Sequence, residues 1–554
     1  MGSGARIEQI PMPMTRSTIL RLALSGLLLF LGINVLYILL IGPYDFWLGS
    51  AHLIATTIFK PLRWFNTTVI VLIIFAAKNR AQQSEVEEGV FENNYWFAVG
   101  LLILICATYY QTFAVNFHVF EWDHRDVSAR LQAPKDFLHL FLTPQPNNFY
   151  RPITFISLWL DYVLFRSHLW AYHLQSLFIH FLNSLVVLKL GSELGLGNRV
   201  SRWAALIFSV AAINFEAVMW PAARFDVLAT LFTLLATLFF LRYQKRHSPS
   251  YLWLSVGCFV LGVLSKESAY SFPLIAALLA LHFVGSRTSH LSRRKQAYAI
   301  LSVALVGAAL VGLRLAMGLG GYRNVGGDSL HFQFNAASLF SFLVNTTGLT
   351  PFAVNSAASF PIYVKVAVAA FVIAMITMAP TTTPFGKKVY LFLAVLVVSA
   401  LPVFSLVGWL RPSLQNARFL YLPAVWMSFA LAVAIVGRSR YVTSILLLLV
   451  VSNSLAAHHN VAVYREMLTK TDYLADQLLQ DHRRMPAETI VLVGLPEAPN
   501  GVFYFPSELA FKVKMQMPNV KVVQLLPEQP PPVGGNSQRV YKWDEPERTL
   551  VLQP

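Results

Sequence analysis

The stretch INFEAVMWPAARFDVLATLFTLLATLFFLRYQKR, residues 213–246, decides the class of this protein. Its centre, residues 226–242, is an apolar run close to the length that a helix needs to cross the roughly 30 Å hydrocarbon core of a bilayer. A charged connection, VMWPAARFD, precedes the run, and Arg242, Lys245 and Arg246 follow it. Basic residues at one end of an apolar helix are typical of the cytoplasmic end of a membrane span.

The composition of the whole chain supports the same class. Of its 554 residues 56% are hydrophobic and only 13% are charged, and the mean hydropathy is +0.55. A soluble fold of this size cannot bury that much apolar surface, so soluble, disordered, coiled-coil and disulfide-scaffold proteins are excluded. The net charge of +16 does not indicate nucleic acid, because much of it lies in short connections between apolar runs. Cys106 and Cys258 lie inside apolar runs and form no metal-binding or disulfide pattern.

We therefore predict a polytopic α-helical membrane protein with about thirteen transmembrane helices. The predicted span cores are 18–42, 52–77, 95–117, 170–189, 203–219, 226–242, 251–265, 269–284, 298–316, 361–380, 389–409, 419–437 and 442–457.

The basic residues between these spans predict the orientation, because every second connection is the basic one. They are Arg6, Arg16 and Arg21, then Lys78 and Arg80, Lys189, Arg199 and Arg202, Arg242, Lys245 and Arg246, Arg287, Arg293, Arg294 and Lys295, Lys387 and Lys388, and Arg438 and Arg440. The amino terminus is thus expected in the cytoplasm, and the segment after residue 457 outside.

Three pieces on the expected outer side are too long to be turns, namely residues 118–169, 317–360 and 458–554. The first contains two stretches suited to helices lying in the interface, from Asp136 and from Ile153. The last begins with an amphipathic helical stretch near residues 461–484. It then alternates strand-like segments with Pro and Gly, which predicts a small C-terminal extracytoplasmic α/β domain. The strand-like segments start at Glu488, Lys521, Arg539 and Arg548.

Ionisable residues beside membrane helices are costly, and here they gather on the expected outer side. They are Glu121, Asp123, His124, Arg125, Asp126, Arg151, Glu216, Arg224, Asp226, Lys266, Glu267, Arg411 and Arg418. One outward-facing polar cavity explains this distribution. Two alternatives remain open: any single arginine can be a headgroup-level anchor, and Lys266 with Glu267 can be a solvated turn.

A polar stripe lies on the predicted helix 170–189. His173, Ser176, His180 and Asn183 follow one another at helical spacing. Hydrogen bonding between helices is the simplest explanation, and a proton path or a metal site is the alternative. The spacing matches no zincin-type motif, so no metal ligand is assigned.

The outer cluster suggests a chemistry. Fixed cations at the membrane surface can bind a lipid phosphate and stabilise it as a leaving group, while a carboxylate acts as general base on an acceptor hydroxyl. A carboxylate held among cations stays ionised at neutral pH, as a base requires.

Five ordered motifs between about residues 95 and 457 resemble the membrane glycosyltransferases of the GT-C class. They are YRPITFISLWLDYVLF (150–165), WAYHLQSLFIHFLNSLVV (170–187), AAINFEAVMWPAARFDVLATLFTLLA (211–236), LSKESAYSFPL (264–274) and ARFLYLPAV (417–425). They are most similar to the transmembrane and tetratricopeptide-repeat O-mannosyltransferases and their bacterial relatives without repeats. Such enzymes have about eleven core helices and transfer a sugar from a polyprenyl-phosphate donor, usually with inversion.

The resemblance implies a domain plan. Residues 1–94 would hold a cytoplasmic segment and an extra transmembrane hairpin, residues 95–457 the catalytic core, and residues 458–554 the outer domain. The absence of tetratricopeptide repeats favours a bacterial inner membrane with the site facing the periplasm.

The resemblance also implies roles for individual residues. The family's first outer loop opens with an acidic pair, which here reads FEWDHRD: Asp123 takes the first position and His124 replaces the second acid. Asp123 is the expected general base, with Asp126 or Glu121 as compensating acids. The expected phosphate ligands are Arg151, Arg224, Lys266, Arg411 and Arg418, and the pocket or orienting residues are His124, Tyr172, His173, Glu216, Asp226, Glu267 and Tyr421.

The expected partners are a polyprenyl-phosphate sugar, an acceptor hydroxyl on a glycan, lipid or protein, and membrane lipids. No cofactor is firmly implied; a divalent cation serves some members of the wider class, but the carboxylates here do not support one. Two other functions stay open, a lipid or glycolipid flippase and an inactive assembly scaffold. Flippases usually carry substrate sites near the bilayer midplane, whereas these charges lie near one surface.

Overall fold

A computed structural model describes residues 44–48, 51–55, 94–115, 131, 134–144, 149–165, 168–283, 292–319, 339, 342–343, 345–347, 350, 384–404, 414–436, 440–496, 499–502, 505–526, 529, 538–544 and 547–553. The chain divides into two compact units, Met1–Ala107 and Thr108–Pro554.

The described part of the first unit holds two strands and most of one helix. β1 (Tyr44–Leu48) pairs antiparallel with β2 (Ala51–Ala55), and α3 (Asn94–Tyr109) begins near the end of this unit. The predicted span 18–42 lies outside the described residues, as do residues 56–77 of the second span. The prediction that the second span starts at residue 52 is wrong, because residues 52–55 belong to β2. Aromatic residues in β1 and a Gly-Ser pair between the strands favour this hairpin.

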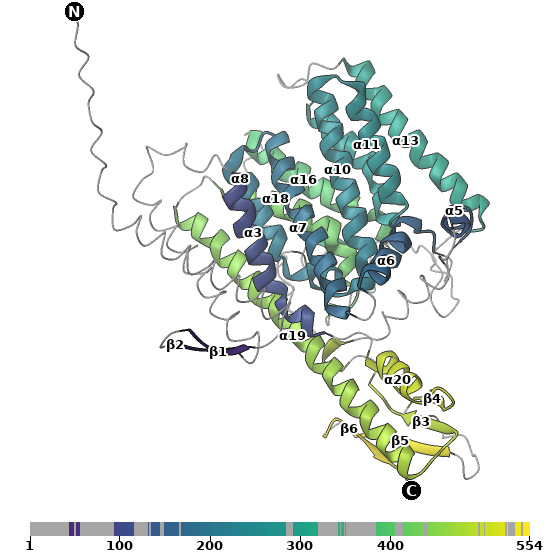
Figure 1. Ribbon diagram of the computed structural model, residues 1–554. Helices are drawn as coiled ribbons and strands as arrows, with labels where there is room; N and C mark the ends of the chain where they lie inside the picture. The colour runs from purple at the N-terminus through teal and green to yellow at the C-terminus, as the bar shows by residue number, and fades with distance from the viewer. Residues whose placement is uncertain are drawn as a thin grey trace, which may run out of the picture. The chain divides into compact units, whose positions relative to one another are not determined.

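The second unit is built mainly from helices (Figure 1). They are η1 (Tyr110–Ala114), α5 (Pro134–Leu142), α6 (Pro152–Phe165), α7 (Leu169–Glu193), α8 (Gly197–Val210), η3 (Ala212–Asn214), α9 (Phe215–Met219), η4 (Pro221–Ala223), α10 (Arg224–Arg246), α11 (Pro249–Val263), η5 (Glu267–Ser271), α12 (Phe272–Phe283), α13 (Arg293–Ala316), α16 (Pro384–Ala400), η6 (Leu401–Val403), η7 (Ala417–Leu420), α18 (Tyr421–Ile435) and α19 (Arg440–Arg484).

Among the described residues, five helices are long and apolar enough to cross a membrane, and a sixth joins them if one bent pair counts as a single span. The five are Tyr95–Ala114, Trp170–Glu193, Pro221–Arg246, Arg294–Ala316 and Ala417–Ile435. The chain is therefore a helical membrane protein. The predicted total of about thirteen spans stays a prediction, because the span 361–380 and the end of the span 389–409 also lie outside the described residues.

The predicted span 203–219 contains a bend. α8 ends at Val210, and the axis turns by 46° before α9. Side chains of α19 bind the backbone at the bend: Asn453 Oδ1 accepts from the Ala212 amide at 3.0 Å, and Asn460 Nδ2 donates to the Ala212 carbonyl at 3.4 Å. A helix can break inside a membrane protein where side chains of another helix satisfy the freed backbone groups.

The predicted span 442–457 and the predicted amphipathic helical stretch near residues 461–484 are both helical, and they form one helix, α19, which runs without a break through Arg440–Arg484. No Gly or Pro interrupts residues 440–484, so the helix continues although its hydropathy changes.

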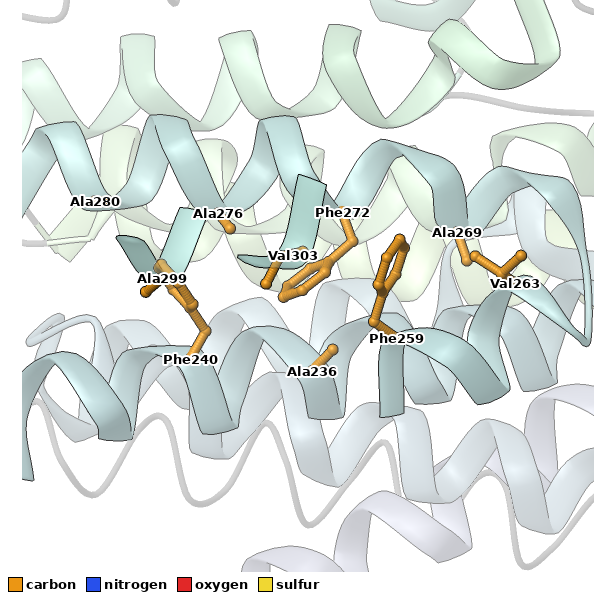
Figure 2. Packing of buried hydrophobic residues seen from close by; sticks show 10 residues of the cluster. All are labelled: Ala236, Phe240, Phe259, Val263, Ala269, Phe272, Ala276, Ala280, Ala299 and Val303. Carbon is orange, nitrogen blue, oxygen red and sulfur yellow. The ribbon is translucent and has the colours of Figure 1, made fainter. Parts of the chain in front are cut away.

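Aromatic rings and alanines pack α10, α11, α12 and α13 together (Figure 2). Phe272 of α12 lies 5.3 Å from Phe259 of α11 and 6.4 Å from Phe240 of α10, measured between ring centroids. Ser255 Oγ donates to the Ala236 carbonyl at 2.8 Å. Helices in lipid associate through this kind of close packing and interhelical hydrogen bonding, because lipid tails are as apolar as the side chains.

The carboxyl-terminal segment contains a four-stranded sheet in the order β4-β3-β5-β6. β3 (Thr489–Val493) pairs in parallel with β4 (Lys521–Leu525) and β5 (Gln538–Asp544), whereas β6 (Thr549–Leu552) is antiparallel to β5. Helix α20 (Phe505–Gln516) joins β3 to β4, and its buried Lys512 Nζ lies 2.5 Å from the Asp472 carboxylate of α19. That this segment is a separate domain outside the membrane remains a prediction.

Candidate functional site

Three cations from three connections surround two phenylalanines. Arg151 precedes α6, Lys266 lies between α11 and η5, and Arg418 lies in η7. The Phe225 ring has the Arg151 guanidinium carbon 4.6 Å and Lys266 Nζ 4.7 Å from its centroid. The Phe419 ring has Lys266 Nζ at 4.7 Å and the Arg418 guanidinium carbon at 4.9 Å. Lys266 therefore joins both pairs, and we call these three residues the cation cluster.

The first arm of the cluster is a carboxylate shared by two arginines. Glu267 Oε2 accepts from Arg151 Nη2 at 2.7 Å and from Arg151 Nε at 3.2 Å. Glu267 Oε1 accepts from Arg314 Nη1 at 2.7 Å. Glu267 is 5% exposed and Lys266 is 1% exposed, so the SKES segment is not a solvated turn. Arg314, near the end of α13, thereby becomes part of the site.

The second arm pairs Lys266 with Asp226 in the first turn of α10. Burial lowers the pKa of Lys266 to about 8, although Asp226 opposes this shift. Arg151 and Arg418 also lie close enough to Asp226 to act on it electrostatically. The α10 amino terminus, with its positive end of the helix dipole, adds a further favourable field for a carboxylate there.

The third arm is the pair of Arg418 and Glu216. The guanidinium binds Glu216 Oε1, and the backbone amide of Arg418 donates to Glu216 Oε2 at 3.0 Å. The Arg418 guanidinium carbon also lies 4.6 Å from the Trp220 ring centroid. Aromatic faces attract cations more strongly where water is excluded. Each cation of the cluster therefore has both a carboxylate partner and an aromatic face.

The charges of this network do not cancel. Four cations, counting Arg314, face the three carboxylates of Glu216, Asp226 and Glu267. The described network thus carries one formal positive charge, which suits it to an anion. Guanidinium and ammonium groups are the usual protein ligands of phosphate.

Arg224 lies in a different environment from the cation cluster. Its fully buried guanidinium binds Asp161 of α6 and donates to Gln175 Oε1 at 2.7 Å, to the Tyr172 carbonyl at 2.9 Å and to Ser176 Oγ at 3.1 Å. These partners lie on α6 and α7, so Arg224 joins three helices. Arg224 was expected to bind the lipid phosphate. Among the described residues, its hydrogen bonds go to α6 and α7 and not to the cation cluster.

The polar stripe on α7 contacts other helices. His180 Nδ1 lies 2.6 Å from Tyr421 Oη, and His180 Nε2 lies 2.9 Å from the Ser209 carbonyl. Asn183 Nδ2 donates to the Val227 carbonyl at 2.9 Å and to Tyr421 Oη at 3.3 Å. These contacts are interhelical hydrogen bonds, the simplest of the explanations for the stripe.

His173 of the same stripe contacts the segment before the first outer loop. Its Nε2 lies 3.0 Å from the Val115 carbonyl, and both residues are buried. The backbone carbonyl of Tyr172, the preceding residue, accepts a hydrogen bond from Arg224.

The expected catalytic acids Glu121, Asp123 and Asp126 lie outside the described residues, as do His124 and Arg411. In the parts of the chain that the structure describes, no group of three His, Cys, Asp or Glu side chains is arranged to hold a metal ion.

Sequence reasoning missed several residues of these networks. Asp161 and Arg314 are isolated charges within or at the end of apolar runs, a signal that could have found them. Phe225 and Phe419 are next to charged residues in the sequence and Trp220 is four residues from Glu216, but an aromatic residue in a membrane protein gives no comparable signal.

The comparisons with known proteins concern the same region. Residues 146–313 match the family model of dolichyl-phosphate-mannose-protein mannosyltransferases. The human protein O-mannosyl-transferase TMTC3 is 34% identical over 124 residues, which is 21% of this chain and 13% of the human protein. Protein O-mannosyl-transferase F38B6.6 of Caenorhabditis elegans is 28% identical over 143 residues, 25% of this chain and 20% of the worm protein. The chain thus matches only a small part of these relatives.

Two solved structures of an archaeal protein are also similar. The oligosaccharyltransferase AglB of Archaeoglobus fulgidus, in complex with an inhibitory peptide and a dolichol-phosphate, is 14% identical with a TM-score of 0.38, covering 78% of this chain and 70% of that chain. The apo form of the Archaeoglobus fulgidus oligosaccharyltransferase is 12% identical with a TM-score of 0.39, covering 76% and 65%.

The match of residues 146–313 supports the resemblance to the GT-C membrane glycosyltransferases that the motifs predicted. It includes Arg151, Glu216, Asp226, Lys266 and Glu267 of the network around the cation cluster.

Proposed function

We propose that this protein transfers a sugar from a polyprenyl-phosphate donor to an acceptor hydroxyl at the outer face of the membrane, with inversion. The observation that carries the proposal is the convergence of Arg151, Lys266 and Arg418 on the rings of Phe225 and Phe419. Three fixed cations in a buried setting match the charge that develops on a leaving lipid phosphate.

The roles within the site follow from the contacts. The cation cluster binds the phosphate of the donor, and Glu216 and Glu267 hold the two arginines in place. Side chains held in this way need no reorganisation when charge shifts from the sugar to the phosphate, which is the condition for electrostatic catalysis. Arg411 is a further proposed phosphate ligand.

Asp123 is the proposed general base, with Glu121 and Asp126 as neighbouring acids. It removes the proton of the acceptor hydroxyl as the hydroxyl oxygen attacks the anomeric carbon, and the sugar–phosphate bond breaks to release the lipid phosphate. His124 and Tyr421 remain proposed pocket residues.

The proposed location is a bacterial inner membrane, with the amino terminus in the cytoplasm and the site and the carboxyl-terminal segment in the periplasm. The acceptor is a hydroxyl of a glycan, a lipid or a protein. The alternation of basic connections along the sequence supports this orientation.

The experiment that tests the proposal measures release of polyprenyl phosphate from a panel of polyprenyl-phosphate sugars by the purified protein in lipid. We expect slow release by the wild type without an acceptor, faster release with one, and loss of both in Asp123→Asn. Asp136→Asn is the matched control, because Asp136 is also an acid of the first outer piece but lies on α5; its release should equal the wild type. Labelled-lipid counterflow without any sugar transfer would instead establish a flippase.

A further inference from the structure

The three carboxylates of the cation network differ in how their oxygens are used. Both oxygens of Glu216 accept from Arg418, and both oxygens of Glu267 accept from arginines. Asp226 binds Lys266 through Oδ1, whereas its Oδ2 is buried and has no hydrogen-bond partner. Within the described network, Asp226 therefore has the one oxygen that can accept a further hydrogen bond without breaking another.

This oxygen needs an explanation, because Asp226 is only 4% exposed. Buried polar atoms in proteins nearly always have a partner, and an exception often marks a functional group or the place of a ligand or water. The ion pair with Lys266 uses Oδ1 only, and no donor among the described residues reaches Oδ2. The Oδ2 atom is thus buried, fixed in place by the pairing of Oδ1 and able to accept a hydrogen bond.

The chemistry of a carboxylate narrows what can bind there. An ionised carboxylate only accepts hydrogen bonds, so it repels a phosphate and attracts a hydroxyl. Lys266, bound to Oδ1 of the same carboxylate, is a proposed phosphate ligand. The group that must lie next to a bound lipid phosphate is the sugar attached to it, and a sugar presents several hydroxyl donors.

We infer that Asp226 Oδ2 accepts a hydrogen bond from a hydroxyl of the donor sugar and so helps to recognise the sugar. This inference rests on the proposed function, because it requires that the cation cluster holds the donor phosphate. Asp226 would then let the protein bind the glycosylated lipid in preference to the bare lipid phosphate, which is the product of the reaction.

The test compares the binding of two lipids to the purified protein in nanodiscs. One is the best-bound member of a panel of polyprenyl-phosphate hexoses, and the other is polyprenyl phosphate without sugar. The measured quantity is the ratio of their two dissociation constants, compared between variants that lose the same charge. Asp226→Ala should reduce the preference for the glycosylated lipid about tenfold or more, as expected for a lost hydrogen bond to a charged group.

Glu216→Gln is the matched control. It also removes one negative charge from the network, but both oxygens of Glu216 already accept hydrogen bonds from Arg418, so no unpaired acceptor is lost. It measures how far the loss of charge alone shifts the ratio, because the bare phosphate is a monoester and carries more negative charge than the phosphodiester of the glycosylated lipid. Asp226→Ala should lower the preference for the glycosylated lipid several-fold further than Glu216→Gln does, and an equal shift in both variants would overturn the inference. Asp226→Asn keeps the shape of the side chain and an acceptor oxygen. It should lose less of the preference than Asp226→Ala, and it provides the measurement if Asp226→Ala does not fold.

The possible results separate the two proposals. If the wild type binds neither lipid, the proposed function fails and this inference fails with it. If both lipids bind and the ratio is unchanged in Asp226→Ala and Asp226→Asn, the inference alone is wrong and Oδ2 binds only water. The inference is also wrong if the Asp226 variants keep the wild-type ratio of dissociation constants but have a raised KM for the acceptor. In that case the hydroxyl that binds Asp226 Oδ2 belongs to the acceptor and not to the donor sugar.

Discussion

The buried pair of Asp161 and Arg224 allows a quantitative prediction about stability. Both side chains are fully buried, and Arg224 also donates to Gln175, Ser176 and the Tyr172 carbonyl. Asp161→Asn would leave a buried guanidinium without its counter-charge, which typically costs about 3–5 kcal/mol. The double variant Asp161→Leu, Arg224→Met removes both charges and should escape that cost.

The double variant has a cost of its own. It leaves four acceptors without the donor that Arg224 supplies, namely Ser157 Oγ, Gln175 Oε1, Ser176 Oγ and the Tyr172 carbonyl. Lost hydrogen bonds contribute about 0.5–1.5 kcal/mol each, and apolar packing between the new side chains offsets part of this. We therefore expect the double variant to lose about 1–3 kcal/mol, less than Asp161→Asn alone.

Reversible unfolding of the purified protein in mixed detergent micelles measures both free energies. Leu160→Ala is a suitable control, because Leu160 lies beside Asp161 on α6 but is 39% exposed. The reasoning is refuted if Asp161→Asn costs no more than Leu160→Ala, or if the double variant is less stable than the single one. The second result would mean that the hydrogen bonds of Arg224 stabilise the three helices more than its charge balance does.

Two further predictions concern helix packing and orientation. A Cβ on Gly191 would lie 2.4 Å from Ser201 Oγ and 2.9 Å from Ser201 Cα, so Gly191→Ala should force α7 and α8 apart and cost about 1–3 kcal/mol in the same unfolding assay. Gly257→Ala on α11 meets nothing within 4 Å and should be neutral or slightly stabilising. In a cysteine-free background, Gln480→Cys should react with a membrane-impermeant thiol reagent added outside, whereas Thr230→Cys, at 1% exposure, should stay silent. Protection of position 480 in intact cells would overturn the predicted orientation.

The position of the cation cluster could be predicted from sequence, but its pairing could not. Arg151, Lys266 and Arg418 are far apart in the chain, and the alternation of basic connections predicts that all three lie on the same side of the membrane. Which carboxylate each cation binds depends on side-chain direction. Glu267 follows Lys266 in sequence, yet it binds Arg151 and Arg314 instead.

The ends of helices α8 and α19 also depend on contacts or backbone continuity that hydropathy alone does not reveal. The apolar run at 203–219 reads as one span, but Asn453 and Asn460 of α19 bind the backbone at Ala212 and permit a bend there. Nothing local to the run reveals partners about 240 residues away. In α19 the fall in hydropathy after residue 457 predicts the end of the membrane span, and the helix itself continues to Arg484. Hydropathy reports the surroundings of a helix, whereas its continuity depends on backbone hydrogen bonds and on the absence of breaking residues.

The carboxylates around the cation cluster have opposing effects on an incoming phosphate. Their charge lowers the local positive potential, and so weakens the attraction for an anion. They also fix the arginine side chains before the ligand arrives, and ordering a long side chain otherwise costs about 0.5–1.5 kcal/mol on binding. Arg151, held by Glu267 and by the faces of Phe149 and Phe225, has little freedom left to lose. For the proposed donor phosphate, the carboxylates therefore reduce the attraction but supply side chains that are already ordered, and the one formal positive charge of the described network favours a single anion.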